Sequence, residues 1–172
     1  MRKIGLFAIV TLLLLSVSAH ADSVFRGLCW GDALNAIVPS YESNSEFEEL
    51  GVEVYRKESE VLNLGSVILN RIEYHFFEDQ LFRIVVFANN EEDNREAAQA
   101  MLRSRYGKHT KQNIFLGEVT WAMSDTTVIW RWPFPGTYEP TITFVSNRLA
   151  KALSDYQEEQ KAIQAEKDAK SW

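Results

Sequence analysis

The stretch Val67–Ala88 constrains the fold of this chain more than any other part of the sequence. Apolar and polar residues alternate from Val67 to Phe77, Glu78-Asp79-Gln80 is typical of a turn, and Leu81–Ala88 supplies a second strand-like run. Alternation with a period of two predicts a half-buried strand, and two such runs around a short polar turn predict a hairpin. We therefore expect an antiparallel β-hairpin here.

We expect the first arm of this hairpin to turn one face toward the core and the other toward water. Successive side chains of a strand point to opposite sides of the sheet. On this basis the core face consists of Ile68, Ile72, Tyr74 and Phe76, broken by Asn70, and the largely wet face of Glu73, His75 and Phe77.

Three helices are expected outside the hairpin. Asp32 is a good N-cap for a short helix over Ala33–Val38. Asn90 is expected to cap a second helix that has an apolar stripe and stops at Gly107. The third begins at about Arg148 and fades into a polar tail.

Four further runs have the pattern of strands, which gives six strands with the two arms of the hairpin. They are Val52–Lys57, Glu118–Met123, Thr127–Trp132 and Thr141–Val145. Successive strands without helices between them favour an antiparallel sheet. The predicted fold class is α+β: an antiparallel sheet of about six strands with helices on one face, in the order α-βββ-α-βββ-α.

The first residues of the chain have the organisation of an export signal. Met1-Arg2-Lys3 is basic, Ile4–Val17 is apolar, and Ala19-His20-Ala21 has the small-x-small form of a leader-peptidase site. A membrane anchor would need about 20 apolar residues, and this run is shorter. We expect signal cleavage after Ala21 and a periplasmic or secreted protein. Residues 22–157 would then form a single α+β domain, and residues 158–172 a polar helical or frayed tail.

Charge narrows the range of expected partners. The chain carries a net charge of −6, and loss of Arg2 and Lys3 with the leader takes this to −8. Such a balance disfavours nucleic acid and anionic membrane surfaces as partners. We expect no membrane anchor after signal cleavage, and an unidentified envelope protein or small ligand as partner.

Cys29, the single cysteine of the chain, lies in the stretch FRGLCWGD between two glycines. It could be a lipid-anchor site, a reactive thiol or part of a packed corner. A lipoprotein signal calls for a small residue just before the cysteine and an aliphatic one three residues before it, where this chain has Leu28 and Arg26. Free cysteines are among the most buried residues, so we expect a packed corner beside Trp30.

No familiar catalytic or cofactor motif is present. The sequence lacks Gly-x-Ser-x-Gly, Ser-x-x-Lys, His-Glu-x-x-His, a phosphate-binding glycine loop and an EF-hand pattern. Glu73 and His75 could offer two metal ligands from one strand face, without a third. A pairing of Cys29 with His75 or His109, or paired carboxylates acting on glycosides, stays an alternative. We expect no cofactor, no metal and no catalytic residue.

Aromatic residues gather toward the end of the chain, at Trp121, Trp130 and Trp132. A core layer is one interpretation, since the helices need a large apolar surface beneath them. The other is a binding lip in which the strand end and the loop PFPGTYEP bring together Trp132, Phe134 and Tyr138. The resulting hypothesis is a periplasmic, non-catalytic binding or protein-interaction module. The alternative is a small envelope hydrolase that uses carboxylates or Cys29.

Three short motifs also carry a resemblance. They are GLCWGD after the leader, IEYHFFEDQLFRIVVF in the hairpin and LRSRYGK at a helix end. Together they resemble small exported bacterial proteins of unknown function that have a Gly-x-x-Trp-Gly opening, a Tyr-x-Phe-turn-Leu hairpin and a Leu-x-x-x-Tyr-Gly helix end. The chain departs from that pattern at Leu28-Cys29 and in its polar tail. The resemblance covers most of the mature chain and implies a secreted α+β domain, with no activity attached.

Overall fold

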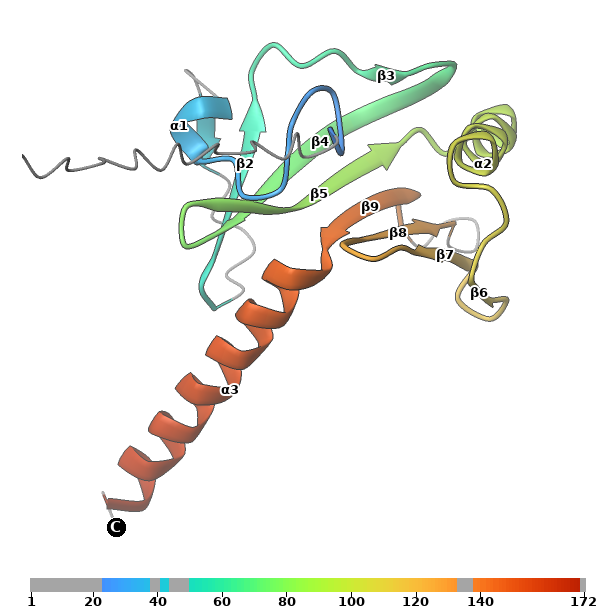
Figure 1. Cartoon of the computed structure of the whole chain (residues 1–172). Coiled ribbons are helices and arrows are strands. Elements are labelled where there is room, and N and C mark those ends of the chain that lie inside the picture. The colour runs from blue at the N-terminus through green and yellow to red at the C-terminus, as the bar shows by residue number, and fades with distance from the viewer. Residues whose placement is uncertain (1–22, 38–40, 44–49, 133–137, 171–172) are drawn as a thin grey trace, which may run out of the picture.

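The computed structural model describes residues 23–37, 41–43, 50–132 and 138–170 (Figure 1). Its helices are α1 (Leu34–Ile37), α2 (Glu92–Tyr106) and α3 (Asn147–Lys170). Its strands are β1 (Tyr41–Ser43), β2 (Val52–Lys57), β3 (Asn63–Leu64), β4 (Val67–Phe77), β5 (Gln80–Ala88), β6 (Lys111–Asn113), β7 (Glu118–Ala122), β8 (Thr126–Arg131) and β9 (Thr141–Ser146).

The strands form an antiparallel sheet in the order β1-β2-β4-β5-β9-β8-β7-β6, and β3 pairs with β4 beside this order. The predicted α+β class with an antiparallel sheet is therefore confirmed. The predicted number of strands was too low, because β1, β3 and β6 have only two or three residues each. Such short runs cannot show a period in the sequence.

The prediction of three helices is wrong, because α1 is a single turn of four residues. Asp32 does not cap it. Its carboxylate instead accepts a hydrogen bond from the Cys29 backbone N–H at 2.8 Å, while the Leu34 backbone N–H donates to Asp79 at 3.2 Å. The Gly31 backbone N–H donates to the Leu81 carbonyl, and the Leu81 N–H donates to the Asp32 carbonyl. These bonds tie residues 31–32 to β5, where a longer helix had been expected to begin.

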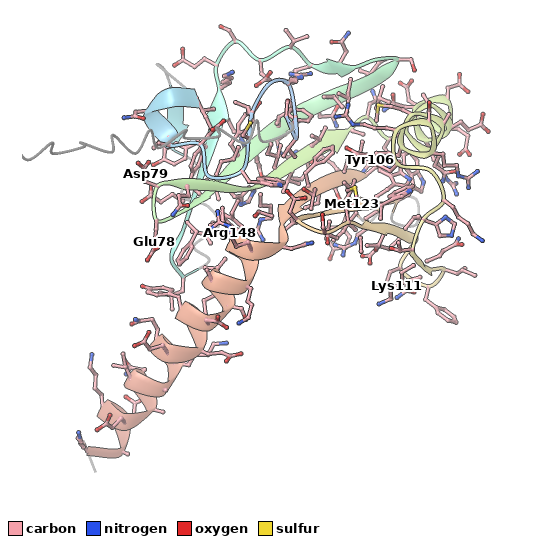
Figure 2. The ribbon with its side chains drawn as sticks, viewed as in Figure 1. Glu78, Asp79, Tyr106, Lys111, Met123 and Arg148 are labelled. Atoms are coloured by element: carbon pink, nitrogen blue, oxygen red, sulfur yellow. The ribbon has the colours of Figure 1, made fainter. Side chains whose placement is uncertain are left out.

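The hairpin is confirmed as β4 and β5, which pair along most of their length. Its turn consists of Glu78 and Asp79, which both have positive φ, at 49° and 58°. Two consecutive residues in this conformation make the tight turn that fits the twist of paired strands. Figure 2 shows Glu78 and Asp79 on the left of the sheet and Lys111 on its right.

The predicted core face of β4 is confirmed at Ile72, Tyr74 and Phe76 and wrong at Ile68, because a β-bulge lies between Leu69 and Arg71. A bulge inserts one residue and reverses which positions face the core. The core side therefore holds Val67 and Leu69 before the bulge and Ile72, Tyr74 and Phe76 after it, while Ile68 is 54% exposed. The supposedly wet face is buried as well, at Glu73, His75 and Phe77.

The two long helices pack on opposite faces of the sheet. The prediction of helices on one face is therefore wrong. Ala98 and Leu102 of α2 join the main core, which includes Phe76 and Ile84. Leu149 and Leu153 of α3 join a second, smaller cluster with Phe77 and Phe82. Phe76 and Phe77 are neighbours on β4, and alternation sends their side chains to opposite sides.

Helix α2 matches its prediction at the end and differs at the start. It stops before Gly107, which has a φ of 73° and donates its N–H to the Arg103 carbonyl. Its N-cap position is Glu91, with no side-chain cap, and not Asn90. Asn94 fastens the first turn to β4, since its side chain bonds both the N–H and the carbonyl of Ile68 at 2.7 and 2.9 Å.

Helix α3 follows β9 directly and extends away from the sheet (Figure 1). Leu149 and Leu153 are its buried residues, and all its residues after Gln160 are exposed. The polar segment expected to be helical or frayed is helical as far as Lys170. Within the described ranges, no helix combines the length and apolarity needed to cross a membrane.

The stretch FRGLCWGD forms a corner against the core. Phe25 is 4% exposed, and the Trp30 indole donates to the Thr126 hydroxyl at 2.8 Å. Gly27 and Gly31 have φ of 85° and 89°, values that favour glycine. Cys29 is half-buried here and less enclosed than expected.

Candidate functional site

The end of β8 places two tryptophans in different surroundings. Trp130 is 1% exposed and belongs to the main core, while Trp132, just beyond the strand, is half-buried. Their rings are in contact, with centres 5.6 Å apart. The Trp132 backbone N–H donates to the Gly117 carbonyl at 2.8 Å, which keeps this part of the chain beside β7 after the regular pairing ends.

A hollow of about 140 Å³ opens between these tryptophans, α2 and the β6–β7 hairpin; we call it the Trp132 hollow. Its lining combines aromatic and aliphatic side chains with one guanidinium, one carboxylate and three amide groups. The lining residues are Arg95, Gln99, Gln112, Asn113, Ile114, Gly117, Glu118, Val119, Trp130 and Trp132. The Arg95 guanidinium carbon lies 5.5 Å from the Trp132 ring centre, within range of a cation–π contact.

Trp130 has an unused hydrogen-bond donor. Its Nε1–H is buried and finds no acceptor among the described residues. By contrast, the Trp121 indole donates to the Gly107 carbonyl at 3.0 Å, and the Trp30 indole donates to Thr126. An unsatisfied buried donor costs about 1–3 kcal/mol, and buried indole N–H groups usually have a partner. Trp130 is therefore an exception among these indoles, and it is also one of the residues that line the hollow.

The structure separates the two predicted lip residues that it describes. Trp132 lines the hollow, and Tyr138 is 79% exposed and is not part of the lining. Phe134 lies outside the described residues. Sequence reasoning missed Arg95 and Gln99, which α2 brings to the hollow at positions one helical turn apart.

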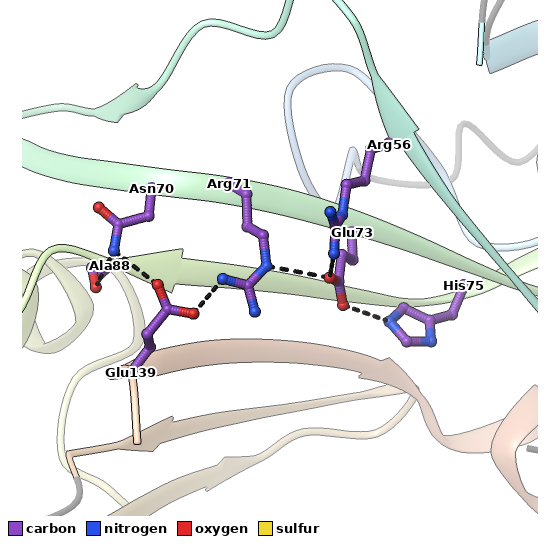
Figure 3. Close-up of polar contacts among 7 residues, drawn as sticks. All are labelled: Arg56, Asn70, Arg71, Glu73, His75, Ala88 and Glu139. Atoms are coloured by element: carbon purple, nitrogen blue, oxygen red, sulfur yellow. Dashed lines mark hydrogen bonds and ion pairs between the residues drawn. The ribbon is translucent and has the colours of Figure 1, made fainter. Parts of the chain in front are cut away.

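A second polar feature lies on the opposite face of the sheet, along β4 (Figure 3). Glu73, which is 4% exposed, accepts hydrogen bonds from Arg56 at 2.7 Å and from Arg71 at 3.2 Å. Arg71 also pairs with Glu139, which accepts a hydrogen bond from Asn70 at 2.9 Å. We call this set, together with His75, the β4 charge row.

The β4 charge row holds Glu73 in its ionised form. Burial alone would raise the pKa of this carboxyl, but hydrogen bonds from His75, Arg56 and Arg71 outweigh burial and lower the pKa to about 2. The pKa of Glu139 is also lowered, since its bonds to Arg71 and Asn70 outweigh its partial burial. A carboxyl with so low a pKa is a poor general acid or base near neutral pH.

His75 is held between two charged groups. Its Nδ1 lies 3.0 Å from an Arg83 nitrogen, and its Nε2 lies 3.7 Å from Glu73. Arginine only donates, so Nδ1 accepts and the ring proton belongs on Nε2, toward Glu73. Neither nitrogen is free to take a proton from a substrate.

The metal site considered from the sequence finds little support in this arrangement. Glu73 and His75 do share one face of β4, but the described ranges contain no group of three side chains able to hold a metal ion. The signal for the β4 charge row was present in the sequence, as Arg71, Glu73 and His75 at alternate positions, but their partners on β2 and before β9 could not be inferred from it.

Comparison with known proteins adds no precedent for this geometry, since no protein-family model, curated protein or solved structure matches the chain. The resemblance to small exported bacterial proteins therefore stays a prediction based on three motifs.

Proposed function

We propose that this chain is a non-catalytic binding module that works in the periplasm, with the Trp132 hollow as its ligand site. The observation that carries the proposal is the buried Trp130 donor without a partner, beside a half-exposed aromatic ring. A ligand that supplies an acceptor to this N–H would remove the cost of leaving it unpaired. The leader-like first residues support a location outside the cytoplasm.

The lining favours a particular kind of ligand. An acceptor such as a carbonyl, carboxylate or hydroxyl would meet Trp130 Nε1–H, and a flat apolar surface would stack on Trp132. Gln99, Gln112 and Asn113 offer both donors and acceptors to a polar rim. At about 140 Å³ the hollow is smaller than most drug-sized sites. It suits one side chain, one sugar unit or the end of a longer molecule.

The alternative of a hydrolase acting through carboxylates is the weaker proposal. The buried carboxyl of Glu73 is engaged by Arg56 and Arg71 and has a pKa of about 2. Cys29 lies in the FRGLCWGD corner and is not among the residues that line the hollow. A catalytic group would be expected in or beside a cavity that can hold a substrate.

The indole N–H signals of a ¹⁵N-labelled protein test the proposal directly. We would titrate the mature chain with amino acids, N-acetylated amino sugars and short peptides, and follow its tryptophan indole resonances. Binding in the hollow should shift Trp130 and Trp132 while leaving Trp30 and Trp121, which already have partners, nearly unchanged. Ligands that shift only Trp30 or Trp121 would place the site elsewhere.

Trp130→Phe then removes the donor and keeps most of the ring. We expect about a 2- to 10-fold loss of ligand affinity, the equivalent of one hydrogen bond. Trp121→Phe is the matched control, because it removes an indole N–H that bonds Gly107 away from the hollow. Unchanged affinity in Trp130→Phe would contradict the role given to this donor.

A further inference from the structure

Three consecutive apolar side chains form the tip of the β6–β7 hairpin; we call them the apolar tip. Ile114, Phe115 and Leu116 are 75%, 90% and 54% exposed. Single exposed apolar residues are ordinary on protein surfaces, but adjacent large ones mark a place that meets an apolar partner. The tip belongs to the edge of the sheet, next to the terminal strand β6 (Figure 1).

The chain that leads to the apolar tip is basic. From Ala97 to Gly117 the sequence holds four Lys or Arg residues and no Asp or Glu, although the whole chain has a net charge of −6. All four are exposed: Arg103, Arg105, Lys108 and Lys111. We call these four residues the basic stretch.

Lys111 is the basic residue closest to the tip along the chain, three positions before Ile114. The first carboxylate after the tip belongs to Glu118, and it forms an ion pair with Arg131 at 2.6 Å. Glu118 therefore does not neutralise Lys111. The local sign of charge beside the tip is positive in an otherwise acidic protein.

We propose that the apolar tip and the two lysines that precede it along the chain, Lys108 and Lys111, dock this protein on a bilayer that contains anionic phospholipids. The tip would enter the boundary between headgroups and acyl chains, while lysine side chains stay at the level of the headgroup phosphates. A projecting tip of three residues can enter a deformable bilayer, whereas a rigid protein partner would need a pocket of matching shape. Apolar insertion and basic attraction are the two signals that together give stable peripheral binding.

The acidic net charge expected to disfavour membranes does not oppose this local arrangement. Charges act over about a Debye length, roughly 8 Å at physiological salt. The exposed carboxylates of α3, such as Glu159 and Glu166, belong to a helix that extends away from the sheet (Figure 1). Binding should therefore depend on which side of the molecule meets the membrane.

Vesicle flotation with the mature chain tests the proposal. One set of vesicles would contain phosphatidylethanolamine with phosphatidylglycerol, and the other phosphatidylcholine alone. We expect binding to the first set and at least about tenfold weaker binding to the second. Phe115→Asp should reduce binding to the anionic vesicles by at least about tenfold, because it places a charge at the tip. Phe115→Trp should keep binding.

Lys108→Glu combined with Lys111→Glu should also reduce binding at least about tenfold, since each basic residue near an anionic surface accounts for about a fivefold effect. Val61→Asp is the matched control, because Val61 is 63% exposed and lies outside the tip. It should bind like the unmodified protein, and thermal melting should show that all variants are folded.

Three results would overturn the proposal: no binding to anionic vesicles, equal binding by Phe115→Asp, or equal losses in Phe115→Asp and Val61→Asp. A fourth is self-association. If size-exclusion chromatography shows a dimer that Phe115→Asp converts to a monomer while vesicle binding is unchanged, the tip is a contact between two copies of this chain.

Discussion

Trp130 lies on β8 and Trp132 just beyond its end, and the two residues differ in burial. Trp130 contributes a fully buried ring to the main core, while Trp132 packs against that core and also lines the hollow. The sequence allowed either a core layer or a binding lip. In the structure both residues line the hollow, and burial decreases from Trp130 to Trp132 where the regular pairing of β8 ends.

Replacing each tryptophan with alanine tests whether its ring contributes mainly to the core or to ligand binding. Trp130→Ala should lower the free energy of unfolding by about 3–5 kcal/mol, because it empties a filled core position. Trp132→Ala should change the melting temperature much less and weaken the binding of any ligand found by the indole titration. Thermal and urea denaturation of both variants provide the measurement.

Tyr138→Ala is the control for this comparison, since that ring is 79% exposed. Its stability should stay within about 0.5 kcal/mol of the unmodified protein. If Trp132→Ala were as destabilising as Trp130→Ala, Trp132 would be a core residue and the hollow would lose its anchor.

Glu73 should make stability depend on pH in the acid range. Its pKa is about 2 in the folded protein against 4.5 in the unfolded chain, so its contribution is complete above about pH 4.5 and is lost as the pH falls toward 2. The shift corresponds to about 3 kcal/mol. Glu73→Gln should lower stability near pH 7 and flatten the fall in urea midpoint between these pH values.

Glu92→Gln is the matched control for Glu73→Gln. The Glu92 side chain is 72% exposed and pairs with Arg95 at 3.6 Å on the surface of α2. Exposed pairs of this kind contribute little to stability. A Glu73→Gln variant with the same acid dependence as the unmodified protein would show that other carboxyls cause it.

Among the elements, β4 shows how one extra residue changes a sequence-based assignment. Strict alternation from Val67 onward placed Ile68 in the core, and the bulge after Leu69 reverses that phase. Nothing local in the sequence distinguishes a continuous strand from a bulged one, because the bulge is defined by the partner strand. The same shift places Asn70 and Arg71 where both reach Glu139.

The start of β2 is fitted closely to α3 at Gly51. This residue has a φ of 82°, and a β-carbon added to it would lie 2.8 Å from the Tyr156 ring. Gly51→Ala should therefore cost more than Gly65→Ala, since Gly65 also has positive φ, 62°, but has nothing within 4 Å. Both variants carry the strain of an unfavourable backbone conformation, so the difference isolates the clash.

We expect this difference to be about 1–3 kcal/mol by urea denaturation, the usual range for overpacking. Adding Tyr156→Ala to both glycine variants should remove most of it, because the double-mutant comparison reports the direct contact. Equal costs for the two glycine changes would mean that α3 moves to accommodate the new methyl group.

The predictability of each element follows from its length. The sequence ranges for β2, β4, β7, β8 and β9 agree with the structure to within about one residue at each end. Long runs carry their own period, whereas β1, β3 and β6 exist through pairing with longer neighbours. Only part of the hollow could be predicted from the sequence. Trp132 belongs to a local aromatic cluster, whereas Arg95 and Gln112 come from distant elements that the fold brings beside it.

At the scale of the whole molecule, the second hydrophobic cluster ties only the first turns of α3 to the sheet. Leu149 and Leu153 are the anchors, and residues after Gln160 make little contact with the rest. Truncation after Gln160 should leave the melting temperature nearly unchanged and reduce the helical circular dichroism signal. Leu153→Ala should instead cost about 2–5 kcal/mol. A large loss of stability on truncation would show that the exposed part of α3 has a packing role.

Which side of the sheet a helix covers was not predictable from either helix alone. The apolar stripe of α2 and the two leucines of α3 both indicate a buried side, but the choice of face depends on the strands around them. The connection after β5 and the direct passage from β9 into α3 decide it.

The lengths of β1 and β6, three residues each at the two ends of the sheet, bear on how this protein behaves when crowded. A long, flat edge strand invites other chains to add strands, which is a route to fibrils and swapped dimers. Short terminal strands present few free backbone groups for such growth. We expect the folded protein to resist seeded fibril formation in concentrated solution, with thioflavin T fluorescence as the measurement, even though most of its long strands lie side by side in one broad sheet.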